Sequence, residues 1–571
     1  MSRQSSISAS AERKWNNALI VIAVGVFALL PAIIYGVPRG NDLPHHYRTA
    51  ISFYDSIREG VLYPGWNAEA NGGYGDPSFR FYPPGAYYAL ASARALAGNW
   101  YDASLFLFAL LSAAGALGVY FWARIFLPAN LATWAGILYT FAPYHINEIY
   151  QAFLLPEYAA SAVLPFAFGF TALVCTKGRA RDVAGLAATY ALLILTHLPL
   201  AVIGSFALLI YALLMIDKTD LLKTMIKLAL AVALGLAASA RYWVTMAAEL
   251  SWMKGSGGKA VLWFDYSYNF LFWKSVEGST TWWANVLAVA TVLLFVPGVT
   301  IALRRKNIGE RTSRAVAARS LGLLVLVSFF MATPLSRLVW MALPPLQKVE
   351  FPWRWLAVTS MCAPIIVAWS IPYWIEKART SKRPLAILAA GCVLAACAVT
   401  MFQIIRGATY LSRPVFDSMA QDIARSNSID YWLPLWAGAR SKGMEGEVEI
   451  DGRSHSVGSR GPQLRAFQVS AGDATDARVR TYYYPHWTAK AGGKRLETRP
   501  DDDGTLLISL PPDAVSVNLE FVEPARVKAA MVASIIGWIL IGVGSVYGYR
   551  IRRRSRHASR SSIPLSDQSP S

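Results

Sequence analysis

Charged residues are scarce in this sequence of 571 residues: only 16% are Asp, Glu, Lys or Arg, whereas 55% are hydrophobic. Soluble domains average about 25% charged residues, so a single water-soluble globule is excluded. Cysteine is also rare, and all four cysteines lie in apolar runs, where they are expected to be small core side chains rather than disulfide partners or zinc ligands. The sequence has neither a Walker motif nor a dinucleotide fingerprint, which argues against ATP-driven transport by this chain alone.

Long apolar runs are abundant, and the mean hydropathy is +0.36. A membrane-spanning helix needs about 20 apolar residues, and on this criterion we predict about twelve spans. The sequence therefore predicts an α-helical polytopic membrane protein whose membrane-embedded part covers residues 1–404. The predicted spans are 17–36, 103–125, 129–143, 158–176, 184–197, 199–216, 226–246, 283–303, 319–333, 357–375, 384–404 and 527–549.

The formal net charge of +19, from 54 basic and 35 acidic residues, is concentrated in a few connectors. If the N-terminus is cytoplasmic and there are twelve helices, every basic connector falls on the cytoplasmic side, as the positive-inside rule requires. The sequence thus predicts cytoplasmic N- and C-termini and no nucleic-acid partner. The basic segments are 177–181, 304–314, 377–383 and the C-terminal tail 550–571.

Four long segments then remain on the outer side: 37–102, 247–282, 334–356 and 405–526. In the first segment we expect two amphipathic helices, over 43–59 and 84–97. The last segment alternates apolar and polar residues between turn signals, as in Leu464–Val469 and Leu506–Leu510, which is typical of antiparallel β structure. We therefore predict a small extracytoplasmic β-sandwich-like domain, inserted before the last span at 527–549.

Ionisable residues cluster next to the outer ends of the predicted spans. Because such groups are costly near lipid, they are functional candidates by default. We expect them to share one external cavity, although they come from distant parts of the chain. The candidate site residues are Asp42, His45, His46, His145, Glu157, His197, Arg241, Glu249 and Arg354.

Asp42, His45 and His46 have alternative interpretations. Asp42 precedes Leu43-Pro44 and can serve simply as the N-cap of a helix with proline in its first turn. The three side chains have the spacing i, i+3 and i+4, which suits metal ligands on one helical face. No cofactor is predicted, and a divalent cation at these residues is the alternative.

The other candidates also have structural interpretations. His197 can be a helix-end histidine bonded to the backbone, and Glu249 can pair with Lys254. Arg354 can extend to the membrane interface or stack on Trp353, because long cationic side chains commonly do both. The sequence alone leaves these alternatives open.

Several short motifs occur in a particular order along the whole chain: Asn41-Asp42-Leu43-Pro44-His45, Phe81-Tyr82-Pro83-Pro84, Pro143-Tyr144-His145, Pro156-Glu157, Leu195-Thr196-His197, Arg241-Tyr242-Trp243, Phe351-Pro352-Trp353-Arg354, Tyr431-Trp432-Leu433-Pro434 and Tyr483-Tyr484-Pro485-His486-Trp487. With these motifs the chain resembles YfhO-like bacterial membrane proteins, including those labelled 6-pyruvoyl-tetrahydropterin synthase-related. More distantly it resembles the GT-C glycosyltransferases, which use polyprenyl-phosphate sugars. The chain departs from its relatives at Ala152 and Phe153, where they usually have an Arg-Gly pair.

The resemblance implies a glycosyltransferase of the bacterial inner membrane that moves a sugar from a polyprenyl-phosphate donor to an envelope glycan, lipid or polymer on the outer side. It places Asp42 as the acid–base residue and Arg354 or Arg241 beside the leaving phosphate. The histidines His145 and His197 would contact the phosphate or orient Asp42, and the β domain would hold the acceptor or cap the cavity. The alternatives are a lipid or polysaccharide transporter, a scaffold for envelope assembly, and an inactive relative of the enzymes.

Overall fold

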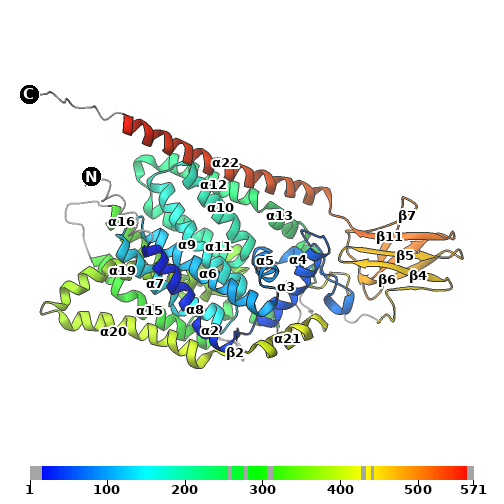
Figure 1. The fold of residues 1–571 in the computed structure, drawn as a ribbon, viewed down its shortest axis with the longest axis horizontal. Helices are drawn as coiled ribbons and strands as arrows, with labels where there is room; N and C mark the ends of the chain where they lie inside the picture. Colours follow the sequence, from blue (N-terminus) through cyan, green and yellow to red (C-terminus); the bar gives the residue numbers. More distant parts are fainter. Residues whose placement is uncertain are drawn as a thin grey trace, which may run out of the picture.

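The computed structural model describes residues 16–254, 260–274, 281–304, 313–425, 432–438 and 443–561. These residues form a helical bundle with a β domain at one end (Figure 1). We call this end of the bundle the β-domain end and the opposite end the far end.

Within the described residues, eight helices are long and apolar enough to cross a membrane. Each follows from an apolar run, because a helix satisfies its own backbone hydrogen bonds inside lipid. A ninth crossing is possible if α16 (Ser313–Met331) forms one span with the segment Pro334–Ala342, from which it is bent by 87°. The eight are α6 (Trp100–Ala123), α9 (Leu155–Thr176), α11 (Leu198–Met215), α12 (Leu221–Ala238), α15 (Thr281–Arg304), α19 (Leu356–Ala378) with the 3₁₀ turn η6 (Pro352–Trp355), α20 (Arg383–Phe402) with the π-helical turn η7 (Gln403–Gly407), and α22 (Ala525–Ser561).

The prediction of a polytopic helical membrane protein is confirmed, and each predicted span is helical. Fewer than twelve of the described helices have the length of a full span, in part because three predicted spans form shorter helices. The run 17–36 divides into a helix over Asn16–Phe27 and α2 (Leu30–Tyr35), and the other two are α7 (Ala129–Thr140) and α10 (Ala180–Thr196). The run 226–246 breaks at Ser239, where α12 gives way to α13 (Ala240–Glu249).

The first helix packs closely on α6 through Gly25. A Cβ atom added at Gly25 would lie 2.8 Å from the Cα of Ala113, so any larger residue would push the two helices apart. Small residues commonly allow such close approach between membrane helices. This contact fixes where the chain leaves the bundle and enters its first long loop.

Segments far apart in the sequence meet at the β-domain end. Strand β1 (Val37–Arg39) pairs antiparallel with β2 (Thr409–Leu411). Strand β1 leads into α3 (Leu43–Arg58), and β2 leads into α21 (Arg413–Arg425), which packs on α3. The expected helices over 43–59 and 84–97 are therefore present as α3 and α5 (Gly85–Ala97), with the short α4 (Ser78–Phe81) between them.

The β domain consists of two antiparallel sheets, as the alternating pattern predicts. Their facing side chains form a shared apolar core, into which Trp66 of the first long loop also inserts, 5.7 Å between ring centroids from Trp487. The loop thus contributes to the core of the β domain. One sheet has the order β3-β6-β10-β9 and the other β4-β5-β11-β7-β8, with β3 (Val448–Ile450), β4 (His455–Gly461), β5 (Leu464–Val469), β6 (Thr475–Tyr482), β7 (Trp487–Ala491), β8 (Lys494–Leu496), β9 (Thr498–Pro500), β10 (Thr505–Leu510) and β11 (Val515–Phe521).

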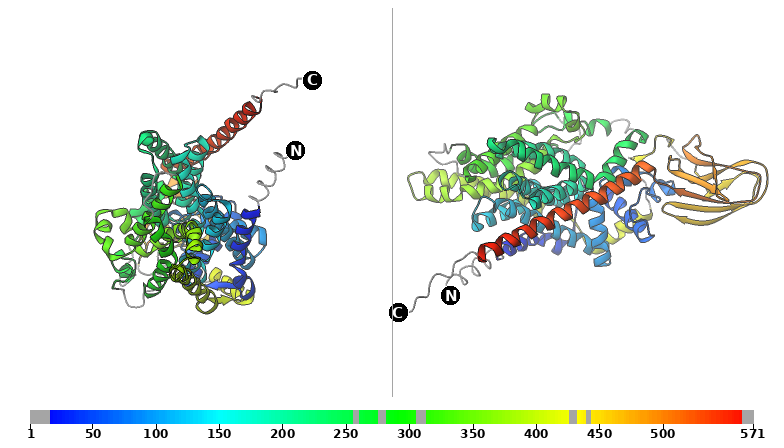
Figure 2. Two further views of the ribbon diagram at one scale, coloured as in Figure 1. Left: turned by 90° about the vertical axis from the view of Figure 1, so that its left-hand side faces the viewer. Right: turned by 90° about the horizontal axis from the view of Figure 1, so that it is seen from above.

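Helix α22 runs from the β domain along the bundle to its far end (Figure 2). There Gly548 packs against Arg181, in the first turn of α10 and at the end of the basic segment 177–181. The turn between α19 and α20, which contains Lys382, is also at the far end (Figure 1). These basic segments therefore lie opposite to the β domain, in agreement with the predicted charge asymmetry. Part of the basic segment 304–314 lies outside the described residues.

Candidate active site

Asp42 stands immediately before α3, at the β-domain end of the bundle. Its backbone N–H donates a hydrogen bond to the carbonyl of Ala152 (3.2 Å), but its side chain makes no capping hydrogen bond to the helix. Burial raises the pKa of the Asp42 carboxyl to about 6; the positive charge of Arg354 opposes this shift, and the negative charge of Glu157 adds to it. The structure therefore does not support the capping role, and a carboxyl shifted towards neutral pH suits proton transfer.

Beside Asp42 lies an ion pair between two of the predicted site residues. Glu157 is in the first turn of α9, where the positive end of the helix dipole favours a carboxylate. Arg354 of η6 donates from Nε to Oε2 of Glu157 (3.0 Å) and from Nη1 to the carbonyl of Val349 (2.9 Å). Tyr144 donates to Oε1 of the same carboxylate at 2.6 Å. The guanidinium is thus held in a fixed orientation.

His197 also reaches this ion pair. Its Nε2 lies 4.0 Å from Oε2 of Glu157, while its Nδ1 accepts a hydrogen bond of 3.4 Å from the backbone N–H of Leu200 at the start of α11. The backbone bond agrees with the helix-end interpretation of His197. Its other ring nitrogen still faces the candidate site, so the two interpretations are compatible.

His45 and His46 lie on the first turn of α3, next to Asp42. Each ring is 6.1 Å from the ring of Tyr82, and Nδ1 of His46 lies 3.2 Å from the Tyr87 hydroxyl. Burial lowers the pKa of both histidines, so both imidazoles are neutral at pH 7. Across the described residues, no group of three or more metal-ligating side chains is placed to hold an ion, which leaves the metal alternative without support.

His145 does not join this site. Its Nδ1 lies 2.9 Å from Oε2 of Glu148, whose Oε1 accepts a hydrogen bond of 2.6 Å from Ser161. The imidazole is sandwiched between Tyr139 and Tyr158, with ring centroids 4.4 and 4.9 Å away. Burial lowers the pKa of His145 to about 3 and raises that of Glu148 to about 8. Helix α8 (Pro143–Tyr150) directs His145 into this buried cluster, and no hydrogen bond or ion pair of the described residues joins it to Asp42.

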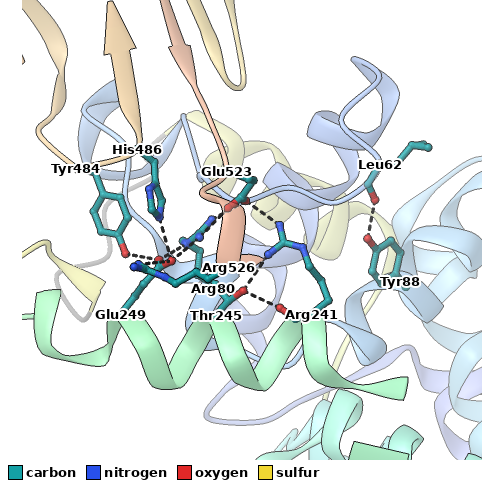
Figure 3. A network of polar contacts seen from close by, with 10 residues as sticks. All are labelled: Leu62, Arg80, Tyr88, Arg241, Thr245, Glu249, Tyr484, His486, Glu523 and Arg526. Carbon is teal, nitrogen blue, oxygen red and sulfur yellow. Dashed lines mark hydrogen bonds and ion pairs between the residues drawn. The ribbon is translucent and has the colours of Figure 1, made fainter. Parts of the chain in front are cut away.

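Glu249 also lies elsewhere, in a buried contact between the bundle and the β domain (Figure 3). Its carboxylate accepts two hydrogen bonds from Arg80, at 2.5 and 2.8 Å. Two side chains of the β domain, Tyr484 and His486, approach the same carboxylate at 2.8 and 2.9 Å. The alternative pairing with Lys254 is not seen, because Nζ of that residue donates to the carbonyl of Ala437 at 3.1 Å.

Arg241 belongs to the same contact. Its Nη2 donates to Glu523 at 2.7 Å, and Glu523 also accepts from Nη1 of Arg80 at 2.7 Å (Figure 3). We call Arg80, Arg241, Glu249, Tyr484, His486 and Glu523 the docking network. Arg241 and Glu249 thus have their charges paired within this network, and no hydrogen bond or ion pair of the described residues joins either to Asp42 or Arg354.

Sequence reasoning missed four members of the docking network, and it did not assign Tyr82 or Tyr144 to the site. For Tyr484 and His486 a signal existed in the motif Tyr483–Trp487, which combines aromatic residues with a histidine. Arg80 and Glu523 carry no local signal, because their burial depends on the approach of the β domain.

Phe153 is a backbone exception close to the site. Its φ angle is +57°, in the left-handed region that favours glycine, and its side chain is fully buried. A Cβ added at Gly40 would lie 2.5 Å from the Cβ of Phe153, so the loop that precedes Asp42 rests directly on this residue. A glycine at this position, as the resemblance implies for relatives, would adopt this φ angle without strain.

The fold and this site define a helical membrane protein with an ionisable cluster at the β-domain end. Residues 79–411, more than half of the chain, match the family of membrane proteins described as 6-pyruvoyl-tetrahydropterin synthase related domain, and the chain belongs to this family. No curated protein sequence matches the chain.

Three solved structures show a low similarity to this chain. The oligosaccharyltransferase of Archaeoglobus fulgidus has 13% identity and a TM-score of 0.44, over 70% of this chain and 57% of its own, so this chain spans little more than half of that protein. The mycobacterial arabinofuranosyltransferase AftD has 13% identity and a TM-score of 0.43, over 73% and 29%. ArnT from Cupriavidus metallidurans, bound to undecaprenyl phosphate, has 13% identity and a TM-score of 0.41, over 74% and 77%.

Proposed function

We propose that the protein is a membrane glycosyltransferase of the bacterial inner membrane, with a polyprenyl-phosphate sugar as donor and an envelope glycan, lipid or polymer as acceptor. The observation that carries the proposal is the position of Asp42, a carboxyl with a pKa of about 6, beside the buried Arg354–Glu157 pair. The distant resemblance of the ordered sequence motifs to those of the GT-C glycosyltransferases adds support.

In the proposed reaction, an acceptor hydroxyl attacks the anomeric carbon of the donor sugar. Asp42 takes the hydroxyl proton as the new glycosidic bond forms, and the bond between the anomeric carbon and the phosphate oxygen breaks. A positioned base of this kind contributes about 10²–10⁴-fold to the rate. The products are the glycosylated acceptor and polyprenyl phosphate, which carries away the bonding electron pair.

Arg354 would stabilise the negative charge that grows on the departing phosphate. Its hydrogen bonds to described residues use Nε and Nη1, so Nη2 is available to a phosphate oxygen. Glu157 and Tyr144 fix the guanidinium before the donor arrives, and such preorganisation is a main source of electrostatic catalysis. His45, His46 and His197 would supply further hydrogen-bonding groups for the sugar.

The proposed topology places both termini in the cytoplasm and the site on the outer side. The far end, which carries the basic connectors, would face the cytoplasm, as the positive-inside rule requires. The donor would then reach the site from the outer leaflet, next to Asp42.

The test compares a strain that lacks the protein with its parent, by mass spectrometry of envelope glycans and lipid-linked sugars. We expect the deletion to lose one envelope sugar and to accumulate the corresponding lipid-linked sugar. Complementation with Asp42→Asn should leave this defect, because Asn is nearly isosteric and caps a helix equally well but cannot accept the proton. Full complementation by Asp42→Asn would refute the catalytic assignment and favour the transport or scaffold alternative.

A further inference from the structure

A groove lies between α3 and α21, next to the candidate active site. Its volume is about 630 Å³, within the range of roughly 300–1,000 Å³ that is usual for small-molecule sites. It begins at Pro44, two residues after Asp42. Its lining is apolar except for three residues and consists of Pro44, Arg48, Pro414, Val415, Ser418, Met419, Asp422 and Ile423.

The wall formed by α21 is firmly attached to the bundle. Arg413 forms an ion pair with Asp102 at the start of α6, and its guanidinium lies 4.5 Å from the ring centroid of Tyr101. Phe416 is fully buried, with its ring 5.1 Å from that of Tyr47 on α3. The groove is therefore a built feature and not a gap beside a loose helix.

Two opposite charges line the groove without neutralising each other. Nε of Arg48 is buried and has no hydrogen-bond partner among the described residues. Asp422, which is exposed to solvent, lines the opposite wall, and no ion pair between it and Arg48 is found within the described part of the chain. A buried donor without an acceptor is unfavourable, so a ligand that supplies an anion to Arg48 would satisfy it.

The groove is also close to the expected lipid surface. The last residue of α20 and the turn η7, which leads through β2 into α21, expose the apolar side chains of Phe402 (54%) and Ile405 (63%). A ligand with an apolar tail at this height can place its tail in lipid and its polar end in the groove.

From these observations we propose that the groove binds the phosphoethanolamine headgroup of a membrane phospholipid, with the phosphate on Arg48 and Ser418 and the primary ammonium on Asp422. Hydrogen bonds to Arg and to a carboxylate are charge-assisted and therefore stronger than hydrogen bonds between neutral groups. The phosphoethanolamine headgroup supplies an anion for Arg and a cation for the carboxylate. The proposal concerns lipid binding and does not depend on glycosyl transfer.

The lining selects among headgroups. A quaternary choline cannot donate a hydrogen bond to Asp422 and is usually bound by aromatic side chains, which the described lining lacks. A phosphoglycerol headgroup brings an anion to Arg48 but leaves Asp422 without a cation. Phosphoethanolamine is the common headgroup that complements both charges.

Native mass spectrometry of the full-length purified protein tests this proposal. The protein is mixed with equal amounts of phosphatidylethanolamine, phosphatidylcholine and phosphatidylglycerol that carry identical acyl chains. We expect phosphatidylethanolamine to be retained preferentially. Arg48→Gln should weaken its retention about tenfold, the effect of one charge-assisted hydrogen bond. Asp422→Asn should remove the preference over phosphatidylglycerol, because the negative charge that repels this lipid is gone.

Matched controls are Arg58→Gln on α3 and Asp417→Asn on α21, which change the same charges outside the groove lining. Equal retention of the three lipids by the parent protein, or Arg48 and Asp422 variants that behave like these controls, would overturn the proposal. A preference for phosphatidylglycerol in the parent would overturn it in favour of a purely anionic ligand. If Arg48→Gln does not accumulate, Arg48→Lys, which keeps the charge, should keep the preference while Asp422→Asn loses it.

Discussion

Replacing Glu249 with Gln should loosen the attachment of the β domain to the bundle. The Glu249 side chain is fully buried and accepts hydrogen bonds from Arg80, Tyr484 and, at 2.9 Å, His486. Gln keeps the shape but removes the charge, so the Arg80 guanidinium loses its main counterion inside the protein. Removing one partner of a buried ion pair typically costs about 3–5 kcal/mol. Glu523 still contacts Arg80 at 2.7 Å, which places the expected loss near the lower limit, about 3 kcal/mol.

The assay is thermal unfolding of the purified full-length protein, followed by intrinsic tryptophan fluorescence, because Trp252 and Trp66 both pack against Tyr484. Glu520→Gln, an exposed change on β11, is the matched control and should shift stability by no more than about 0.5 kcal/mol. If Glu249→Gln unfolds at the temperature of this control, the docking network does not hold the β domain.

The loss of stability caused by Glu249→Gln should also depend on pH. Hydrogen bonds from His486 and Arg80 hold the pKa of Glu249 below its ordinary value of 4.5. A carboxyl whose pKa is lowered on folding contributes its full stability above the unfolded pKa and loses it as the pH falls through the folded value. The parent and Glu249→Gln should therefore differ most at neutral pH and converge in strong acid. A difference that grows towards low pH would contradict this sign.

Four further predictions concern the site and the topology. Arg354→Lys should lose most transfer activity while the protein still accumulates, because Lys keeps the charge but not the planar guanidinium with its fork of donors. Full activity of this variant would show that Arg354 only anchors the chain at the membrane interface. Initial transfer rates should rise with pH around a midpoint near 6, because the base form of Asp42 is the carboxylate and its pKa is raised to about 6; a midpoint near 4 would exclude Asp42 as the base. In thermal unfolding, Phe153→Gly should be more stable than Phe153→Ala by about 1 kcal/mol, since of the two residues only glycine adopts a φ of +57° without strain. A Phe153→Ala variant that is the more stable of the two would show that the backbone is unstrained here. A reporter fused after Gly452 should be external and one after Arg383 cytoplasmic, and a cytoplasmic reporter at Gly452 would refute the proposed topology.

The fold was largely predictable, because its signals are local. Apolar runs, the alternating pattern of 447–510 and the proline at the start of 43–59 each determine a nearby element, and all are found. The number of crossings was not predictable to the same degree. Whether α7, with 12 residues, reaches across lipid depends on its neighbours rather than on its composition.

The candidate site was predictable only in part, for a physical reason. Asp42, His45 and His46 share one helical turn, so their proximity follows from spacing. The pairing of Glu157 with Arg354 joins residues 197 positions apart, and the bond from Arg80 to Glu249 joins residues 169 apart. The positions of charged residues at the ends of predicted spans cannot show which of these residues form ion pairs with one another. For this reason the same reasoning grouped Arg241 and Glu249 with Asp42 and Arg354, whereas the structure pairs Arg241 with Glu523 and Glu249 with Arg80.

The docking network and the candidate active site are joined through α4. Arg80, at one side of this short helix, is bound by Glu249 and Glu523, whereas Tyr82, two residues later, contacts the rings of His45 and His46.

Phe81 lies between these two residues and is held from both sides. Its ring stacks on Trp432, in the segment that leads to the β domain, with centroids 5.9 Å apart, and its carbonyl accepts a hydrogen bond of 3.0 Å from Tyr242 on α13. Since packed interiors transmit displacements, we expect a shift of the β domain to move Tyr82. We infer that the β domain helps to position the wall of the site, so loss of Glu249 should disturb His45 and His46 as well as domain attachment.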